Sequence, residues 1–490
     1  METVGFRVTR KESISLERIN HWIGGKTVGG ESGRTGPVFN PATGVQTHEV
    51  DFATVEELDA AVGAARDAFP AWRATSLSKR ADVLFRLREL LDQRKPELAR
   101  VVSSQHGKVV SDAMGEIQRG IENIEYATSI PNLLKGGFSE QVSTGVDVFS
   151  IRQPLGVVAG ITPFNFPAMV PMWMFANAIA CGNTFILKPS EKDPSASLFL
   201  AELLQDAGVP DGVYVNLFAT HEQVAGMIAD PRLHGVSLTG SERAGTVVAE
   251  TAGHNLKKVV LELGGSDPYI ILDTGDVEDA AKTAWVTRME NVGQACNSNK
   301  RMIVMDDIYD DFVAALVKRA TAMSPRQAGD DSPRSYSPMV SRKAAENLLA
   351  QVQDAVSKGA TLHVGGTLDG GKGAYFAPAV LTGVTPDMRA YREELFGPVA
   401  VVYKVSNDDE AVQLANVVDF GLGGAVWSTD EERAIKVAEQ LEVGMANVNT
   451  PAGEGADLPF GGTKRSGFGR ELGPLGVDEF VNKRLFYVEK

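Results

Sequence analysis

The chain is poor in the residue types that build disulfide scaffolds, metal clusters and nucleic-acid surfaces. Its 490 residues include two cysteines, Cys181 and Cys296, and seven histidines, none of them in an HExxH pair. This excludes a disulfide framework and a cysteine-rich zinc site, and we expect no metal. The 48 basic and 63 acidic residues leave a net charge of −15. That balance disfavours nucleic acid and anionic membranes as partners, because both bind to basic patches.

Membrane spans and secretory signals are also missing from the sequence. Residues 1–20 contain no apolar core of a signal peptide, which predicts a cytoplasmic protein. Residues 153–187 carry no charge, but they are interrupted by prolines and by amides that are costly in lipid: Pro154, Pro163, Pro167, Pro171, Asn165, Asn177 and Asn183. We therefore predict a buried strand–loop–helix–strand segment of a central parallel sheet.

The first half of the chain changes its periodicity near residue 155. Residues 54–135 repeat apolar side chains at helical spacing, with a capping box predicted from Thr54 and Glu57 and a serine cap at Ser111. Short β-branched runs then alternate with amphipathic helices, at 155–160, 184–190, 213–218, 235–240 and 257–263. This alternation predicts βαβ units and a doubly wound parallel sheet.

A second alternating block occupies about 268–455 and predicts a second α/β lobe, with a ligand cleft between the two lobes. Two segments fit neither lobe. Residues 143–153 have the pattern of an extended arm, and 477–490 that of a terminal strand. An exposed apolar terminal strand is an edge hazard, so we expect it to pair with another subunit. A strand folded back on its own domain is the alternative.

Cys296 is the best candidate nucleophile. It lies in NVGQACNSNK (291–300), among small polar residues that are unusual for a core. A thiolate is a strong nucleophile that forms next to a base, a dipole or a cation. An inert buried cysteine is the equally weighted alternative here, and it is the favoured interpretation for Cys181, which has apolar neighbours.

Three further motifs could carry chemistry. Glu262 ends a predicted strand in LELGG (261–265), where a buried carboxylate is costly unless it is paired or functional. Gly240 and Ser241 stand at a strand-to-helix junction suited to phosphate, although the spacing is not a P-loop and the signal is weak. Asn165, in PFNFP (163–167), could donate to an oxyanion or tie a loop.

Seven ordered motifs give the chain a resemblance to NAD(P)-dependent aldehyde dehydrogenases: PFNFP (163–167), KPSE (188–191), LTGS (238–241), LELGG (261–265), GQAC (293–296), EELFGP (393–398) and PFGGTKRSGFGRE (459–471). The resemblance covers nearly the whole chain. It implies an α/β fold with a Rossmann-type cofactor domain (1–134 and 154–258) and an α/β catalytic domain (259–460). It also implies a small oligomerisation arm (135–153 and 477–490) in a homodimer or homotetramer.

The same resemblance implies roles for individual residues. Cys296 matches the nucleophile that forms a thiohemiacetal and then a thioester, Asn165 the oxyanion hole, and Glu262 the base. Positions matching cofactor contacts are Lys188 and Glu191 at the adenosine ribose, Gly240 and Ser241 at the pyrophosphate, Glu394 and Phe396 at the nicotinamide end, and Ile161, Thr162, Pro163 and Gly264 along the site. The expected substrate residues are Arg119, Phe164 and Phe460. We expect NAD, because Glu191 would repel a 2′-phosphate, with NADP as the alternative since Lys188 and Lys192 are close by.

The two halves resemble different relatives within this family. Residues up to about 210 resemble methylmalonate-semialdehyde dehydrogenases, which pass the acyl group to coenzyme A, whereas residues from about 213 resemble succinate-semialdehyde dehydrogenases. The coenzyme A enzymes carry an arginine before the nucleophile, here Ala295, and typically lack the Glu262 carboxylate. We therefore expect oxidation of a short semialdehyde, such as succinate semialdehyde, to the free acid. An acylating methylmalonate- or malonate-semialdehyde dehydrogenase, an aromatic aldehyde dehydrogenase and a non-catalytic protein on this fold are the alternatives.

Overall fold

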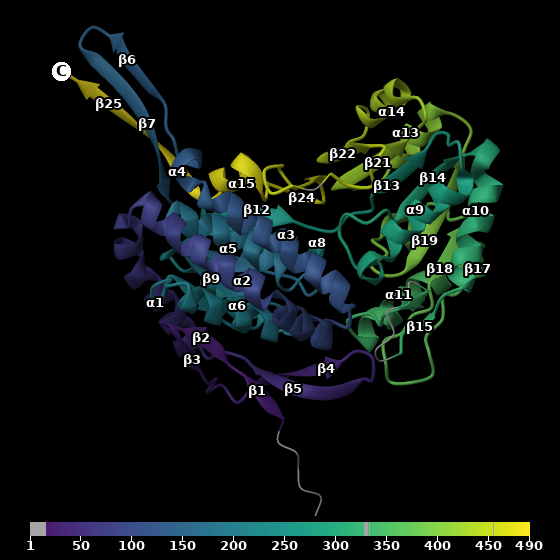
Figure 1. Ribbon diagram of the computed structural model, residues 1–490, viewed down its shortest axis with the longest axis horizontal. Coiled ribbons are helices and arrows are strands. Elements are labelled where there is room, and N and C mark those ends of the chain that lie inside the picture. The colour runs from purple at the N-terminus through teal and green to yellow at the C-terminus, as the bar shows by residue number, and fades with distance from the viewer. Residues whose placement is uncertain (1–15, 328–331, 333, 454) are drawn as a thin grey trace, which may run out of the picture.

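The computed structural model describes residues 16–327, 332, 334–453 and 455–490. Two lobes, each built on a mainly parallel sheet, lie side by side, and a three-stranded arm projects from the first lobe (Figure 1). The signal-peptide prediction concerns residues 1–20, most of which lie outside the described residues. Within the described ranges, no helix combines the length and the apolar character needed to cross a membrane.

The first lobe contains an eight-stranded sheet in the order β24-β12-β11-β8-β9-β10-β2-β3. Its strands are β24 (Gly467–Phe468), β12 (Lys258–Glu262), β11 (Leu233–Thr239), β8 (Val157–Ile161), β9 (Thr184–Lys188), β10 (Tyr214–Asn216), β2 (His21–Ile23) and β3 (Lys26–Val28). The five strands from β12 to β10 are parallel, as the alternating pattern predicted. The chain builds outward from β8 through β9 and then crosses to β11 on the other side of β8. A doubly wound sheet has its ligand crevice at such a switch point.

Helices cover both faces of this sheet: α1 (Val55–Ala74), α2 (Leu77–His106), α3 (Val110–Thr128), α4 (Ile130–Leu133), α5 (Met169–Cys181), α6 (Ser195–Asp206), α7 (His221–Ala229) and α8 (Glu242–His254). The predicted capping box of Thr54 and Glu57 is present. The predicted serine cap is wrong: α3 begins after Val109, so Ser111 lies inside its first turn. Every residue of α5 is buried, which confirms that the charge-free segment belongs to the core.

The second lobe contains a seven-stranded sheet in the order β17-β18-β19-β14-β13-β21-β22, parallel except for the edge strand β17. Its strands are β17 (Thr361–Val364), β18 (Ala379–Thr382), β19 (Val399–Val405), β14 (Arg301–Met305), β13 (Pro268–Ile271), β21 (Gly423–Trp427) and β22 (Met445–Val448). Its helices are α9 (Val277–Met289), the short η1 (Glu290–Gly293), α10 (Asp306–Thr321), α11 (Arg342–Ser357), α12 (Arg389–Arg392), α13 (Asp408–Asn416) and α14 (Glu431–Ala438). The connection between the two large sheets runs from Glu262 to Pro268, slightly beyond the expected boundary at residue 259.

Smaller sheets complete the body. They pair β1 (Glu17–Ile19), β5 (Val45–Asp51) and β4 (Thr35–Asn40); β15 (Ser324–Pro325) and β16 (Ser335–Tyr336); and β20 (Phe420–Gly421) and β23 (Thr463–Lys464). The short helix α15 (Gly473–Asp478) precedes the terminal strand.

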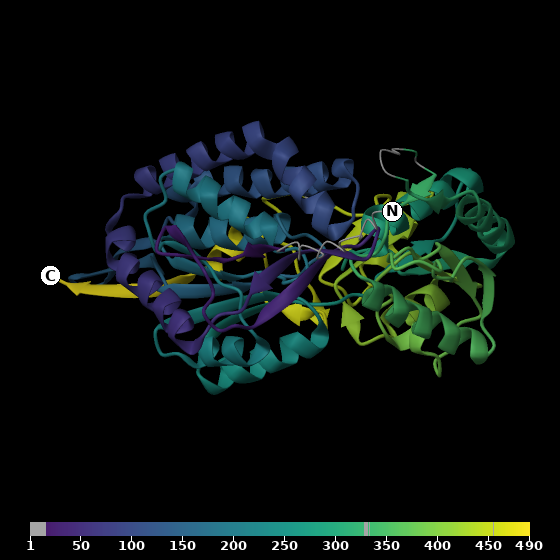
Figure 2. The same ribbon diagram turned by 90° about the horizontal axis from the view of Figure 1, so that it is seen from below.

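The arm consists of β6 (Phe138–Ser143), β7 (Val146–Pro154) and β25 (Val481–Glu489), with the C-terminus at its tip (Figures 1 and 2). All nine residues of β25 pair antiparallel with β7, and Phe149 stacks on Phe486 with ring centroids 4.9 Å apart. The terminal strand therefore folds back on its own chain along one edge, which is the alternative named above, and pairing of its other edge with another subunit stays a prediction. The extended segment before β8 already supplies a partner strand within the same chain.

Candidate active site

A cavity of about 610 Å³ opens where both lobes meet at the switch point of the first sheet. The predicted residues that line it are Cys296, Asn165, Gly240, Ser241, Gly264, Glu394, Phe396, Pro163, Arg119, Phe164 and Phe460. Those that do not line it are Glu262, Lys188, Glu191, Ile161 and Thr162. Segments following β8 and β11 supply one wall, and the loop before β14 supplies the wall that carries Cys296.

The loop that presents Cys296 has a strained and tightly held backbone. Asn291 and Val292 adopt left-handed conformations, with φ of 50° and 58°, which are costly for residues that carry a Cβ. Gly293 follows with φ of 70°, and a Cβ there would lie 2.3 Å from the Gly397 carbonyl oxygen. Only glycine fits at that position, so the turn fixes where the nucleophile emerges.

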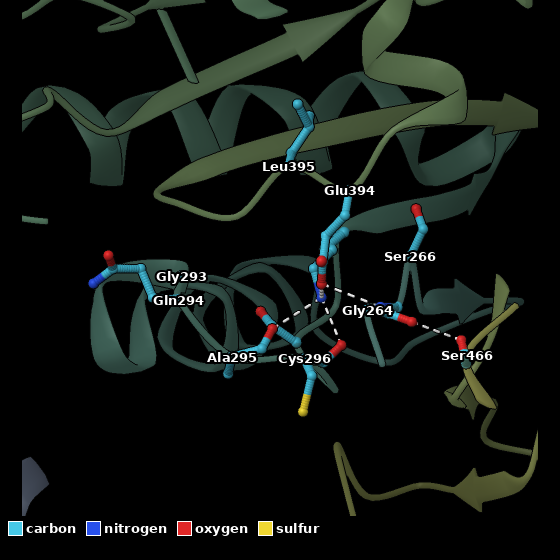
Figure 3. Close-up of polar contacts among 12 residues, drawn as sticks. Gly264, Ser266, Gly293, Gln294, Ala295, Cys296, Glu394, Leu395 and Ser466 are labelled. Carbon is cyan, nitrogen blue, oxygen red and sulfur yellow. Dashed lines mark hydrogen bonds and ion pairs between the residues drawn. The ribbon is translucent and has the colours of Figure 1, made fainter. Parts of the chain in front are cut away.

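Lys300 holds the same loop from behind. Its Nζ donates to the carbonyl oxygens of Ala295 at 2.9 Å and Cys296 at 2.6 Å. It also forms an ion pair with Glu394 at 3.1 Å, and the Gly265 N–H donates to the same carboxylate oxygen at 3.1 Å. In Figure 3 the Cys296 sulfur points away from Glu394. The ammonium group thus fixes the backbone of the nucleophile and leaves its thiol directed toward the cavity.

Burial raises the pKa of the Cys296 thiol to about 12. The positive charge of Lys300 opposes this shift, and the carboxylates of Glu394, Asp267 and Glu262 reinforce it. Cys296 is therefore a neutral thiol at pH 7, and attack on a carbonyl needs a base that removes its proton.

Two buried carboxyl groups near the cavity form no ion pair within the described part of the chain. Neither carboxyl oxygen of Glu262 has a hydrogen-bond partner among the described residues. Burial and then the charge of Glu471 raise the pKa of Glu262 well above its usual range, opposed by Arg470. Burial also raises the pKa of Glu471 to about 8, and its Oε1 accepts a bond from the Thr239 hydroxyl at 3.4 Å. Glu471, with its pKa of about 8, can exchange protons near neutral pH, and the pKa of Glu262 is shifted in the same direction.

Asn165 follows β8 and directs its side chain to the cavity wall, while its backbone is fixed from the opposite side. Its carbonyl oxygen accepts a hydrogen bond from Lys108 Nζ at 2.7 Å and another from Asn291 Nδ2 at 2.9 Å. The amide and Cys296 therefore line one cavity from two loops that are themselves bonded together. An amide donor beside a nucleophile can stabilise the oxyanion formed by attack on a carbonyl.

Three independent features suit the residues around Ser241 and Gly264 to binding a dinucleotide. Ser241 caps α8, its Oγ accepting from the Ala244 N–H at 3.3 Å, so the N-terminus of this helix faces the cavity. Anionic groups bind well at such a terminus. At Gly264 a Cβ would lie 2.5 Å from Glu394 Oε2, so only glycine leaves this carboxylate where it stands. All these positions follow the carboxyl ends of parallel strands, where doubly wound sheets bind nucleotides.

Lys188 and Glu191 lie beyond the cavity lining and form an ion pair of 3.2 Å. Burial acts to raise the pKa of Glu191, but the charge and hydrogen bond of Lys188, a backbone hydrogen bond and the charge of Lys192 together outweigh it and leave the pKa below its usual value. Glu191 is therefore ionised at neutral pH. Ile161 ends β8, and the Thr162 N–H donates to the Lys188 carbonyl at 3.1 Å, so both belong to the sheet edge that supports the site.

The substrate end of the cavity combines aromatic rings with one ion pair. Trp173 and Phe460 pack with ring centroids 5.2 Å apart, and Phe164 meets Phe396 edge to face at 5.8 Å. Arg119 Nη1 lies 3.5 Å from Glu290 Oε1, and both side chains line the cavity. The predicted carboxylate-binding arginine is thus in place beside a carboxylate of the protein itself.

Sequence reasoning missed two residues of this site. Glu471 is the last residue of the quoted motif PFGGTKRSGFGRE, and Lys300 ends the segment that holds Cys296. Within that motif, only Phe460 has a predicted side-chain role. A cation close to a candidate thiolate was a signal that could have identified Lys300.

Comparison with known proteins agrees with this geometry. Residues 28–485 match the sequence model of the aldehyde dehydrogenase family. The chain belongs to this family. Like other members, the enzyme is an NAD(P)-dependent oxidoreductase.

Three proteins of this family are similar to the chain over nearly its whole length. A succinate-semialdehyde dehydrogenase (NADP+) of Deinococcus radiodurans is 46% identical over 91% of this chain and 93% of its own length. A malonate-semialdehyde dehydrogenase of Pseudomonas aeruginosa is 40% identical over 95% of both chains. The NAD+ complex of an aldehyde dehydrogenase from Bacillus cereus superposes with a TM-score of 0.93, at 33% identity, over 96% of this chain and 97% of that one.

Proposed function

We propose that this aldehyde dehydrogenase oxidises a short semialdehyde, such as succinate semialdehyde, to the free dicarboxylic acid through a thioester on Cys296. The observation that carries the proposal is the Glu262–Glu471 pair. Neither carboxyl group forms an ion pair among the described residues, Glu471 lines the cavity with Cys296, and the charge of Glu262 acts on the thiol. The pair supplies the proton acceptor that thiol activation and hydrolysis both need.

The first half of the reaction follows from the positions of the side chains. Glu262 accepts the thiol proton, directly or through one water molecule, and the Cys296 sulfur forms a bond to the aldehyde carbon. The carbonyl π electrons move to oxygen, and the Asn165 amide with the Cys296 N–H stabilises that oxyanion. NAD(P)+, when bound, supplies the acceptor for the hydride that leaves this carbon. The residues fitted to hold it are Ser241, Glu394 and Lys188 with Glu191.

The second half releases the acid. Glu262 first releases the thiol proton to solvent and then accepts a proton from a water molecule as the water oxygen attacks the thioester carbon. The tetrahedral adduct collapses, the carbon–sulfur bond breaks, and the leaving Cys296 thiolate takes that proton back from Glu262. Ala295 supports water as the acceptor, because no arginine stands before the nucleophile as it does in the acylating relatives. Glu262 supports the same conclusion, since those relatives typically lack it.

The semialdehyde assignment is supported by Arg119, which lines the cavity and can bind a distal carboxylate through its guanidinium fork. The relative from Deinococcus radiodurans bears the name of this activity. The acylating malonate-semialdehyde alternative is favoured by one observation, the 40% identity to the Pseudomonas aeruginosa enzyme.

We propose NAD as the preferred cofactor, since the ionised Glu191 carboxylate would repel a 2′-phosphate and already occupies the Lys188 ammonium. In the same proposal the first lobe binds the cofactor, the second carries the nucleophile, and the arm joins subunits in a homodimer or homotetramer. Exposed apolar side chains on the arm support its role in assembly: Phe138, Val142, Leu485, Tyr487 and Val488.

The test is NADH formation from succinate, malonate and methylmalonate semialdehydes and from benzaldehyde, each with and without coenzyme A. The proposal expects turnover of succinate semialdehyde without coenzyme A and a free acid as product. Turnover only with coenzyme A, with an acyl-CoA product, overturns the hydrolytic mechanism. Benzaldehyde as the best substrate overturns the role of Arg119, and light scattering of the purified enzyme reports its subunit number.

A further inference from the structure

A fully buried ion pair lies directly behind the loop that carries Asn165. Lys108, between α2 and α3, and Glu116, on α3, meet at 2.6 Å, and both side chains are 0% exposed. Neither residue lines the cavity. Two charges removed from water are costly to bury, and the same space could hold apolar side chains without that cost. The retention of the pair therefore calls for a reason beyond packing.

The pair contacts the backbone on both sides of the Asn165 loop. Lys108 Nζ donates to the Asn165 carbonyl at 2.7 Å and lies 4.6 Å from the centroid of the Phe166 ring. Glu116 Oε1 accepts from the N–H groups of Ala168 at 2.8 Å and Met169 at 3.1 Å, where α5 begins. The two charged groups thus hold residues 165–169 at both ends, and each charge neutralises the other.

A second donor to the same carbonyl links this loop to the nucleophile. Asn291 Nδ2 donates to the Asn165 carbonyl at 2.9 Å and to the Gln294 carbonyl at 3.1 Å. Gln294 in turn accepts from the Val340 N–H at 3.0 Å and precedes Cys296 by two residues. One carbonyl oxygen therefore fixes the oxyanion-binding loop to the nucleophile loop.

We propose that Lys108, held in place by Glu116, is a positioning residue for the side-chain amide of Asn165. With its carbonyl held by two buried donors, the Asn165 peptide cannot rotate, so the amide keeps its direction toward the oxygen that becomes negative. An amide displaced by about 1 Å from that direction loses much of its effect on the rate. The inference rests on the proposed function, in which Asn165 stabilises the oxyanion.

The test separates positioning from simple stabilisation through the variant Lys108→Met/Glu116→Leu. This variant removes both charges together but leaves the N–H groups of Ala168 and Met169 without their acceptor, so the melting temperature should fall, as in the control Trp72→Phe described below. A purely structural pair predicts an unchanged rate of the first-turnover NADH burst. Positioning predicts a burst rate about 10- to 100-fold lower with little change in KM, which is less than the roughly 10²- to 10³-fold loss expected when an oxyanion donor is removed altogether.

The Asn165→Ala background decides whether the effect passes through the amide. If Lys108 acts on Asn165, adding Lys108→Met/Glu116→Leu to Asn165→Ala lowers the burst rate no further. Additive losses, or a double variant with wild-type burst rate, overturn the inference. A wild-type burst rate in Asn165→Ala itself would instead overturn the proposed function, so the two failures are distinguishable.

Glu116→Gln covers the case in which the double variant does not fold. Glu116→Gln keeps the side-chain volume and weakens the ion pair with Lys108. We expect a several-fold slower burst in the wild-type background and no further slowing in the Asn165→Ala background. Trp72→Phe is the matched control, because Trp72 Nε1 donates to the buried Ile179 carbonyl at 3.0 Å, away from the cavity. It should lower the melting temperature and leave the burst rate unchanged.

Discussion

The two sides of the Asn165–Cys296 site bury carboxyl groups equally deeply but treat them in opposite ways. Glu116, behind Asn165, is 0% exposed and pairs with Lys108 at 2.6 Å. Glu262 is 2% exposed and Glu471 6%, and neither forms an ion pair among the described residues; the charge of Glu471 raises the pKa of Glu262, and the charge of Arg470 only partly opposes this. The partner, more than the burial, therefore decides whether a buried carboxylate serves as a fixed structural charge or as a group that exchanges protons.

Replacing the nucleophile gives the largest expected effect, because without the Cys296 thiol the Glu262 and Glu471 carboxyl groups have no thiol proton to accept. Cys296→Ser should lower turnover by about 10³-fold or more, since a serine hydroxyl is a far weaker nucleophile in a site that lacks a strong base. NADH formation measures turnover, and fluorescence titration should show unchanged cofactor binding. Cys181→Ala is the matched control and should keep wild-type activity, so equal loss in both variants would contradict the mechanism.

Glu262→Gln tests the role of the Glu262–Glu471 pair in proton transfer, in contrast to the Lys108–Glu116 pair. A neutral amide cannot accept a proton, so hydrolysis of the thioester should slow by about 10²- to 10⁴-fold. Mass spectrometry should then show an acyl group on Cys296 after exposure to aldehyde and cofactor. The variant should melt no lower than the wild type, whereas Glu116→Gln, which disturbs a buried ion pair, should melt lower. A lower melting temperature for Glu262→Gln but not for Glu116→Gln would contradict the assignment of Glu116 as the structural charge and Glu262 as the proton-exchanging group.

Glu471→Gln tests whether the two carboxyl groups are coupled, because it removes one charge from the Glu262–Glu471 pair. Glu471 raises the pKa of Glu262, so its replacement should lower that pKa and shift the rising limb of the pH–rate profile to lower pH. The measurement is the hydrolysis rate between pH 5 and 10 in both enzymes, on the same substrate. An unchanged limb would mean that the two carboxyl groups act independently.

The same pair makes stability depend on pH in a defined direction. Glu471, with its pKa raised to about 8, stays protonated in the folded state at pH values where the unfolded chain has already released that proton. The free energy of unfolding should therefore fall as pH rises from about 4.5 to 8. Urea denaturation at several pH values measures the slope, which should be smaller in Glu471→Gln and unchanged in the control Trp72→Phe.

The smallest expected effect concerns a third, exposed carboxylate. Glu290 lies 3.5 Å from Arg119, and its side chain is 51% exposed, so water weakens the pair. Glu290→Gln should lower the KM for succinate semialdehyde a few-fold and leave the KM for butanal unchanged, because only the former carries a carboxylate that competes for Arg119. Arg119→Met should raise the former KM and again spare butanal. Equal changes for both aldehydes would contradict a role in carboxylate binding.

Local patterns were sufficient for much of the fold. The strands β8, β9, β10, β11 and β12 appear where β-branched runs predicted them, since a strand buried on both faces needs such residues. The Thr54 capping box formed because both of its bonds are local. Ser111 failed as a cap because α3 starts at Val110, two residues earlier than a cap at Ser111 requires. The small polar neighbours of Cys296 along the chain were likewise enough to identify it as the candidate nucleophile.

Only the tertiary structure decided which residues far apart in the chain come into contact. The sequence determined the elements, the order of the motifs and the resemblance to the family, because these depend on neighbours along the chain. The facing of Glu262 and Glu471, the donation of Lys108 to the Asn165 carbonyl and the pairing of β25 with β7 join segments far apart in the chain. Such contacts depend on how sheets and helices pack, and no periodicity along the chain records that arrangement.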